Sequence, residues 1–276
     1  MIKDIVVNLS LAENGGYAGD FAVSVASTVG AHLTGIAFVY DPIVPVAATG
    51  YIPPEVIETQ QRDNEAAAQT AVVRFNAAAG RAGITVESDK LPAGLASAGE
   101  QFGRIARRFD LAIVAQAEPE KNAVEDLIAE SVLFESGRPV IIVPYIQKAP
   151  LKLSRVMACW DGSRQATRAI ADAMPLLERS GQVELVIVAN ERGKQDEIPG
   201  ADMGEHLARH GLKVDVNRIT EGDIDVADAL LSHAADASID FMVMGGYGHS
   251  RLREFVLGGV TRSVLRSMTV PVLMSH

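Results

Sequence analysis

The stretch "MGGYGHSRLREFVLGGV", from Met244 to Val260, holds two glycine clusters on either side of a short basic segment. The first cluster, within residues 245–248, follows an apolar run, and the second, at 258–259, precedes an amphipathic pattern. Glycine permits the positive φ angles of turns, and it also lets backbone come very close to a ligand. A helix that begins directly after glycines presents free N–H groups to an anion. Turn chemistry and anion binding both explain these residues.

The chain contains two similar segments. Residues 109–145 and 239–276 each have an aspartate, an apolar strand pattern, a loop, an amphipathic helix, a proline and a second apolar strand. The aspartates, Asp110 and Asp240, correspond to each other. A repeat of ordinary domain size indicates two copies of one unit. We expect the units at 1–147 and 152–276, joined by a short linker.

The order of elements predicts an α/β fold. Strand patterns without polar alternation are typical of strands buried on both faces, as in a parallel sheet. Regular alternation of strands and helices predicts a doubly wound, Rossmann-like sheet in each unit. A helix is expected over 53–83, and another that begins after Ser163 and stops at Gly181. The apolar edge strands at 140–144 and 270–274 need cover, so the two units should meet there about a pseudo-twofold axis.

Composition limits the classes of partner. The chain has 276 residues, a formal net charge of -10 and a pI near 5.1. An acidic chain has no general attraction to nucleic acid or to anionic membranes, so neither is an expected partner. Cys159 is the only cysteine, which excludes an intrachain disulfide and a cysteine-based zinc site. The first ten residues lack the basic flank and long apolar core of a signal peptide, so we expect a cytoplasmic protein.

Three stretches together resemble the nucleotide-binding branch of the universal stress protein family. They are "MACWDGS" at 157–163, "ELVIVANE" at 184–191, and the spacing Gly245-x2-Gly248-x9-Gly258. The resemblance covers nearly the whole chain as two tandem units. It implies a sensor or regulator of stress responses that binds ATP or AMP, with Mg²⁺ as an optional companion. It also implies strand order 3-2-1-4-5 and pairing of the units within one chain through their last strands, and it leaves a homodimer of chains open.

The resemblance also implies roles for individual positions. An aspartate after the first strand would hold the adenosine, a valine of the next strand would offer its main chain to adenine, and a methionine would flank the base. Glycines and a helix start would bring backbone N–H groups to the ribose and phosphates. The matching positions, in chain order, are Cys159, Trp160, Asp161, Val188, Met244, Gly245, Gly248, Gly258, Gly259 and Val260.

The second unit departs from the family pattern at one of these positions. The family has Ser or Thr directly after the last glycine of the motif, where this chain has Gly259. A hydroxyl donor to phosphate is therefore missing, and one hydrogen bond to a charged group contributes about 1.5–3 kcal/mol. We expect weaker nucleotide binding rather than its loss. Thr261 and Ser263 carry the nearest alternative hydroxyls.

The first unit departs much further. Its counterpart of the glycine segment, "AQAEPEKNAVEDLIA" at 115–129, has no glycine and adds the carboxylates of Glu118, Glu120, Glu125 and Asp126. Its first strand ends without a counterpart of Asp161. The first 150 residues hold 11 Lys and Arg against 18 Asp and Glu. Because carboxylates repel phosphate, we expect nucleotide in the second unit alone.

Several of these residues also fit purely structural roles. Asp161 could cap the following helix, since aspartate is a common N-cap. His249, Arg251 and Arg253 fit a solvated loop, and no Ser/His/Asp arrangement, metal-ligand spacing or GxxxxGK[ST] loop is present in the sequence. An interaction scaffold that has lost its ligand and a slow ATPase are the two rival functions.

Overall fold

The computed structural model describes residues 1–12, 15–42, 53–118, 123–189, 200–220, 225–246 and 259–276. The first unit comprises β1 (Asp4–Asn8), α1 (Tyr17–Val29), β2 (His32–Tyr40), α2 (Pro54–Ala82), β3 (Glu87–Ala93), α3 (Ala98–Ala106), β4 (Leu111–Ala115), α4 (Ala123–Glu135) and β5 (Val140–Val143). The second comprises β6 (Arg155–Cys159), α5 (Arg164–Leu177), β7 (Gln182–Ala189), α6 (Ala201–Arg209), β8 (Val214–Thr220), α7 (Val226–Asp236), β9 (Phe241–Gly245), α9 (Val260–Ser267) and β10 (Val272–Ser275).

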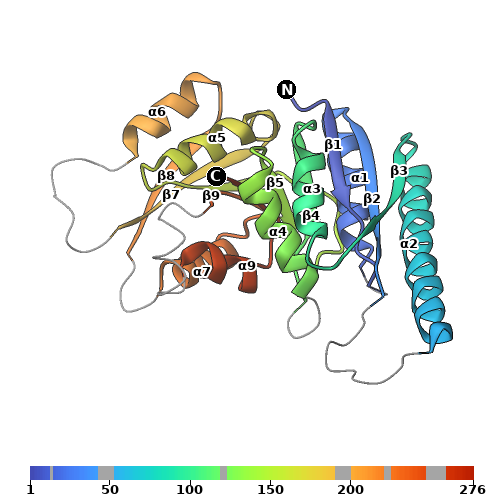
Figure 1. The fold of residues 1–276 in the computed structure, drawn as a ribbon. Coiled ribbons are helices and arrows are strands. Elements are labelled where there is room, and N and C mark those ends of the chain that lie inside the picture. Colours follow the sequence, from blue (N-terminus) through green and yellow to red (C-terminus); the bar gives the residue numbers. More distant parts are fainter. Residues whose placement is uncertain (13–14, 43–52, 119–122, 190–199, 221–224, 247–258) are drawn as a thin grey trace.

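The two units share one ten-stranded sheet (Figure 1). Its order is β3-β2-β1-β4-β5-β10-β9-β6-β7-β8, which is 3-2-1-4-5 counted within each unit. The expected α/β fold with this strand order is therefore confirmed. The units join where β5 and β10 pair antiparallel, with Leu273 opposite Ile141. These strands lie within the two apolar edge segments that the sequence predicted to meet.

Helices cover both faces of the sheet and enclose two apolar clusters. One cluster packs under α1, α2, α5 and α6, and we call its side the α1/α5 face. The other packs under α3, α4, α7 and α9, and we call its side the α4/α9 face. Strand side chains alternate between the faces, so Val156 and Ala158 of β6 face α5, and Met157 faces the other way. Burial on both faces explains why the inner strands are apolar without alternation.

Local signals set most helix boundaries. The side chain of Ser163 caps α5 by accepting the Ala166 N–H at 3.1 Å, as expected. The expected stop at Gly181 is wrong, because α5 ends at Leu177. Gly181 instead allows the turn into β7 to approach the backbone of Ser154, whose carbonyl oxygen would lie 2.7 Å from an added Cβ. None of the helices in the described ranges combines the length and apolar character needed to cross a membrane.

Candidate functional site

The strand order of the second unit reverses at β6. β6 pairs with β7 on one side and with β9 on the other, so the connections that follow β6 and β9 leave the sheet at a shared carboxyl edge. Ligands of doubly wound sheets bind at such a reversal point. The pairing of Ala158 with Val243 places Cys159 and Met244, which come next in their strands, at the same level. The sheet therefore brings the ends of the two predicted motifs together.

Four of the predicted positions share one apolar cluster. Cys159, Val188, Met244 and Val260 all belong to the cluster on the α4/α9 face, although they come from three strands and a helix. Met244 is buried, and the other three are half-buried. Three of them, Cys159, Val188 and Met244, stand at or near the carboxyl ends of β6, β7 and β9, and apolar side chains of this kind line small-molecule sites.

Trp160 lies on the opposite side of the sheet. Its ring packs against the cluster of the α1/α5 face, and a Cβ on Gly200 would contact both this ring and Ile187. The backbone N–H of Trp160 donates to the Val186 carbonyl at 2.9 Å. The structure therefore separates the Trp160 side chain from that of its neighbour Cys159.

The main chain of Val188 lies beyond the end of β6. Backbone groups two residues apart on a strand point to the same neighbour, so Val186 and Val188 both point toward β6. β6 ends at Cys159, which pairs with Val186. On its other side β7 continues beside β8, where Val188 pairs with Ile219. The backbone of Val188 is thus directed toward the space that follows the end of β6.

Asp161 is exposed, and it forms a turn rather than the helix cap. Its Oδ1 accepts the Ser163 N–H at 2.9 Å, while Ser163 itself supplies the cap of α5. This short-range bond uses one carboxylate oxygen and orients the side chain at the edge of the sheet. The alternative that Asp161 is the N-cap of α5 is therefore wrong, because Ser163 holds that position.

Gly245, one of the predicted glycines, is constrained by close packing. An added Cβ on Gly245 would lie 2.6 Å from the Ala166 nitrogen and 2.7 Å from the Gln165 carbonyl carbon, both in the backbone of α5. Gly245 is thus required by the contact between β9 and α5, whatever its role toward a ligand. Gly248 and Gly258 lie outside the described residues, as do His249, Arg251 and Arg253.

Gly259 is the N-cap residue of α9 and has an extended backbone, with φ -62° and ψ 152°. Its carbonyl accepts the N–H groups of Arg262 and Ser263 at 3.0 and 3.2 Å, and no side chain caps the helix start. Thr261, one of the two alternative hydroxyl residues, is buried within the first turn. Because this φ suits any L-residue, the departure from the family Ser or Thr has no backbone cause.

The thiol of Cys159 is not poised for chemistry. Burial, together with the nearby Asp161 carboxylate, raises the pKa of Cys159 to about 12, so the thiol is protonated at neutral pH. Cys159 instead fits this environment as a small residue packed against the apolar cluster. In the part of the chain that the structure describes, no three His, Cys, Asp or Glu side chains are grouped to hold a metal ion.

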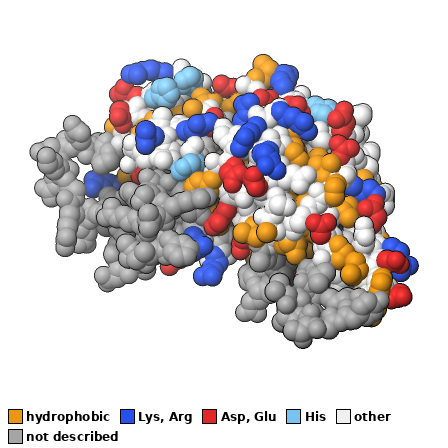
Figure 2. Space-filling model, viewed as in Figure 1, with side chains coloured by type: hydrophobic (Ala, Val, Ile, Leu, Met, Phe, Trp, Pro, Cys, Tyr) orange, Lys and Arg blue, Asp and Glu red, His pale blue; other side chains and the backbone are white. Residues whose placement is uncertain are grey.

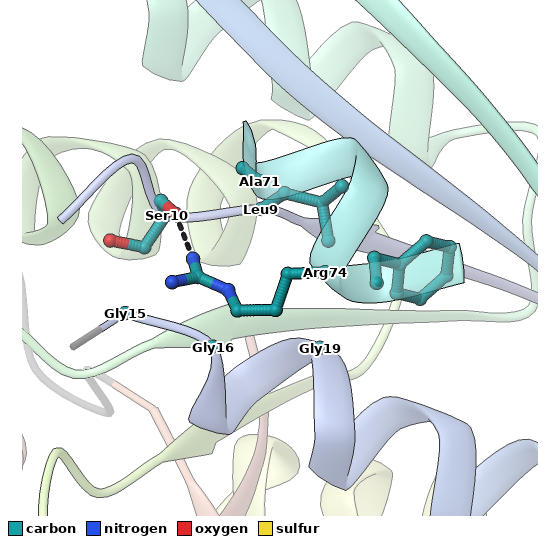
Figure 3. A pocket seen from close by; sticks show the side chains of 8 residues that line it. Leu9, Ser10, Gly15, Gly16, Gly19, Ala71 and Arg74 are labelled. Atoms are coloured by element: carbon teal, nitrogen blue, oxygen red, sulfur yellow. Dashed lines mark hydrogen bonds between the residues drawn. The ribbon is translucent and has the colours of Figure 1, made fainter. Parts of the chain in front are cut away.

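The equivalent edge of the first unit is filled by its own side chains. The Ser10 hydroxyl donates to the Glu125 carboxylate at 2.9 Å, and the Arg74 guanidinium donates to the Ser10 carbonyl at 3.1 Å. Figure 3 shows Arg74 reaching from α2 across this corner toward Ser10. The cavity that remains beside them measures about 10 Å³, room for roughly one water molecule. The sequence identified Glu125 as unfavourable to phosphate, but not that it bonds to Ser10.

Burial also affects the ionisation of this corner. Removal from water raises the pKa of Glu125, although the hydrogen bond from Ser10 opposes this effect. Burial and the charge of Glu125 raise the pKa values of Tyr17 and Tyr40. Glu125, Tyr17 and Tyr40 therefore all ionise less readily than they would in water.

Comparisons with known proteins match the sequence of the second unit to a family and the fold of the chain to solved structures. Residues 152–276 match the family model of the universal stress protein family. The universal stress protein Slr1230 of Synechocystis is 28% identical over 147 residues, which are 52% of this chain and 49% of that protein. The chain thus spans about half the length of this curated relative.

Solved structures cover the whole chain. A universal stress protein from Archaeoglobus fulgidus aligns with 99% of this chain and 96% of its own, with a TM-score of 0.72 and 18% identity. A candidate universal stress protein from Pseudomonas aeruginosa covers 99% and 93%, with a TM-score of 0.59 and 13% identity. At these identities the likeness concerns the fold, which is the tandem α/β fold described above. The match to the family model itself is confined to residues 152–276.

Proposed function

We propose that the chain is a tandem universal stress protein, with units at 1–147 and 152–276, that binds one adenine nucleotide in the second unit. The ligand is ATP or AMP, with Mg²⁺ accompanying ATP. The protein acts as a nucleotide-dependent sensor or regulator in the cytoplasm, and its two units form an internal pair. The resemblance of the sequence motifs and the match of residues 152–276 to the family support this proposal.

One observation carries the proposal. Cys159, Val188, Met244 and Val260 pack against the same apolar cluster, and Asp161, two residues after Cys159, carries an exposed carboxylate. An apolar surface suits a base, a carboxylate suits ribose hydroxyl groups, and a helix start suits phosphate. The three parts of a nucleotide thus find three suitable surroundings at one edge of the sheet.

Charge and space explain why the first unit would not bind. Glu125 of the first unit lies where an anion would need donors, and Ser10 already bonds to it. On the face shown in Figure 2, acidic and basic side chains are interspersed over the described surface. A carboxylate at the strand edge and a surface of mixed charge both give phosphate little electrostatic attraction.

Titration calorimetry with ATP and with AMP tests the stoichiometry. We expect one site per chain, and mass spectrometry of the denatured protein should detect co-purified adenine nucleotide. Two equivalent sites per chain would contradict the proposal for the first unit. No binding of either nucleotide would favour the interaction scaffold instead.

Substitutions at Asp161 separate ligand binding from local structure. Asp161→Asn keeps an oxygen that can accept the Ser163 N–H but removes the negative charge, and Asp161→Ala removes both. We expect both variants to bind ATP at least about tenfold more weakly, the equivalent of roughly 1.4 kcal/mol.

The chain provides a matched control for these variants. Asp225 makes the same kind of bond, because its Oδ1 accepts the N–H of Ala227, two residues on, at 2.9 Å. Asp225→Ala should lower stability without changing the ATP affinity. If Asp161→Asn bound ATP as the wild type does, Asp161 would have only the structural role that Asp225 has.

A further inference from the structure

Gln116 occupies the position in the first unit that Gly246 occupies in the second. Each follows the fourth strand of its unit, and each donates its backbone N–H across to the last strand at 2.8 Å, Gln116 to Val143 and Gly246 to Ser275. In the first unit this position thus carries a long polar side chain, and that side chain is buried, with 3% of the residue exposed. A buried amide needs partners for both of its ends.

The partners of the Gln116 side chain come from both units. Its Nε2 donates to the carbonyl oxygen of Leu265 at 2.8 Å and to that of Arg266 at 3.2 Å, in the last turn of α9. Its Oε1 accepts the N–H of Tyr145 at 3.1 Å, just after β5. The side chain of one residue therefore ties the end of α9 to the strand ends of the first unit.

These bonds matter because α9 has little stability of its own. The helix has eight residues, and isolated helices of that length do not persist in water. The last four carbonyl groups of a helix lack partners within it, and Gln116 serves two of them. The Val264 carbonyl is served by the Met268 N–H at 2.8 Å. No side chain caps the start of α9 at Gly259. The bonds from Gln116 at the C-terminal end are therefore the side-chain support that this helix receives at its ends.

A second contact between the units involves Gly246, directly after β9. Leu133 of α4 packs so closely on Gly246 that an added Cβ there would lie 2.8 Å from its Cδ2. The Gly246 carbonyl lies 3.1 Å from His276 Nδ1, and the His276 ring stacks edge-on against Phe134 of α4 at 4.9 Å. The first unit thus contacts both the residue at the end of β9 and the last turn of α9.

We propose that the first unit, which lacks a ligand motif, positions α9 of the second, and that Gln116 is the positioning residue. Gln116 holds α9 by its C-terminal carbonyl groups, which fixes the direction of the N–H groups at its start. The consequence for nucleotide affinity rests on the function proposed above, whereas the hold on α9 does not. Gln116 bonds to the last turn of α9, at the opposite end from the helix start, so its effect on binding is transmitted through α9.

Hydrogen exchange of Gln116→Leu in the full chain tests the hold directly. Leucine fills a similar volume but donates no hydrogen bond to Leu265 or Arg266. We expect the Met268 N–H, whose bond closes the end of α9, to exchange at least about tenfold faster, while amides of β4 exchange as before. We also expect roughly threefold or greater weakening of ATP binding, because the helix start is less well directed.

Tyr17→Phe is the matched control. The Tyr17 hydroxyl donates to the backbone carbonyl of Gln116 at 2.9 Å, so this variant removes a bond at the same residue without touching α9. It should leave both Met268 exchange and ATP affinity unchanged. If Gln116→Leu does not fold, Gln116→Met serves instead, because its flexible thioether side chain has a similar length and donates no hydrogen bond to α9.

The outcomes separate the two proposals. Met268 exchange in both Gln116 variants that stays within about twofold of the wild type overturns the hold. Faster exchange with unchanged ATP affinity overturns the positioning of the site. Wild-type protein that binds no ATP defeats the proposed function, and the exchange measurement still decides whether Gln116 holds α9.

Discussion

Asp110 and Asp240 form the same pair of hydrogen bonds in the two units. Asp110 Oδ2 accepts the backbone N–H of Asp4 at 3.1 Å, and Asp240 Oδ2 accepts that of Arg155 at 3.0 Å. The backbone N–H of each aspartate donates in return to the carbonyl of the same partner at 2.9 Å. The correspondence of these aspartates, expected from the repeat, is confirmed by this shared geometry at the start of each unit's first strand.

Alanine at either aspartate should destabilise the fold. Asp240→Ala leaves the Arg155 N–H without its carboxylate and breaks the 2.7 Å ion pair with Lys152, so we expect a loss of about 1–3 kcal/mol in the free energy of unfolding. Asp110→Ala should cost a similar amount. Urea titration followed by circular dichroism measures both. Asp236→Ala, at an exposed carboxylate in the last turn of α7, should change stability by less than about 0.5 kcal/mol.

Gly245→Ala should lower stability independently of any ligand. The new Cβ would overlap the backbone of α5, and backbone can make room only by moving the helix, which costs about 1–3 kcal/mol. Gly80→Ala is the control, since nothing lies within 4 Å of its added Cβ and the residue is helical. That variant should gain up to about 1 kcal/mol. Equal stability of the two variants in a thermal melt would show that β9 and α5 do not pack so closely.

Gly259→Ser should stabilise α9 and, under the proposed function, tighten nucleotide binding. The extended backbone of Gly259 suits a serine N-cap, whose hydroxyl accepts an N–H of the first turn. The gain over glycine as a cap is a few tenths of a kcal/mol. A well-directed bond from the hydroxyl to phosphate would add up to about tenfold in affinity.

Gly259→Ala distinguishes the hydroxyl from the added carbon in that experiment. It supplies the Cβ without the oxygen, so it should weaken the helix start and leave affinity no better than in the wild type. Calorimetry with ATP on both variants gives the comparison. Tighter binding by the alanine variant would count against a role for the hydroxyl.

Two glutamates withdrawn from solvent, Glu184 and Glu125, should change stability with pH in opposite directions. Glu184 accepts hydrogen bonds from Asn217 at 2.9 Å and Arg155 at 3.2 Å and pairs with His233 at 2.6 Å. Burial acts to raise its pKa, but these partners together outweigh burial and lower the pKa below 4.5. The unfolded chain then binds a proton more readily than the folded one. The stabilisation by Glu184 is therefore complete above about pH 4.5 and is lost as the pH falls through the folded pKa.

Burial raises the pKa of Glu125 above 4.5, so the sign there is reversed. Its favourable contribution is present below about pH 4.5 and is lost as the pH rises through the folded pKa. At pH 7 we expect Glu184→Gln to lose on the order of 2 kcal/mol and Glu125→Gln to gain stability. Both differences should shrink near pH 3. Unfolding measured at about pH 3, 5 and 7 checks the two slopes, and slopes of equal sign would contradict this assignment.

Much of the fold could be predicted from sequence because its signals are local. Periodicity and Pro/Gly boundaries placed a helix at 53–83, and α2 spans Pro54–Ala82. Ser163 was predicted as an N-cap from its position alone, and it caps α5. The repeat fixed the correspondence of Asp110 with Asp240, and the strand order followed from the family resemblance. Signals of this kind depend on residues a few positions apart, or on whole segments compared with each other.

The tertiary structure alone decided which distant residues meet. From the sequence, Gly245 was explained by turn chemistry or by close approach to a ligand. Its tightest neighbours are instead the backbone atoms of α5, far earlier in the chain. Gln116 gave no signal, since its partners at Leu265 and Arg266 lie in the other unit. Trp160 and Cys159 are adjacent in sequence but pack on opposite faces of the sheet. Periodicity records that a side chain is buried, whereas its contacts depend on strand order and helix packing, and these are set by the chain as a whole.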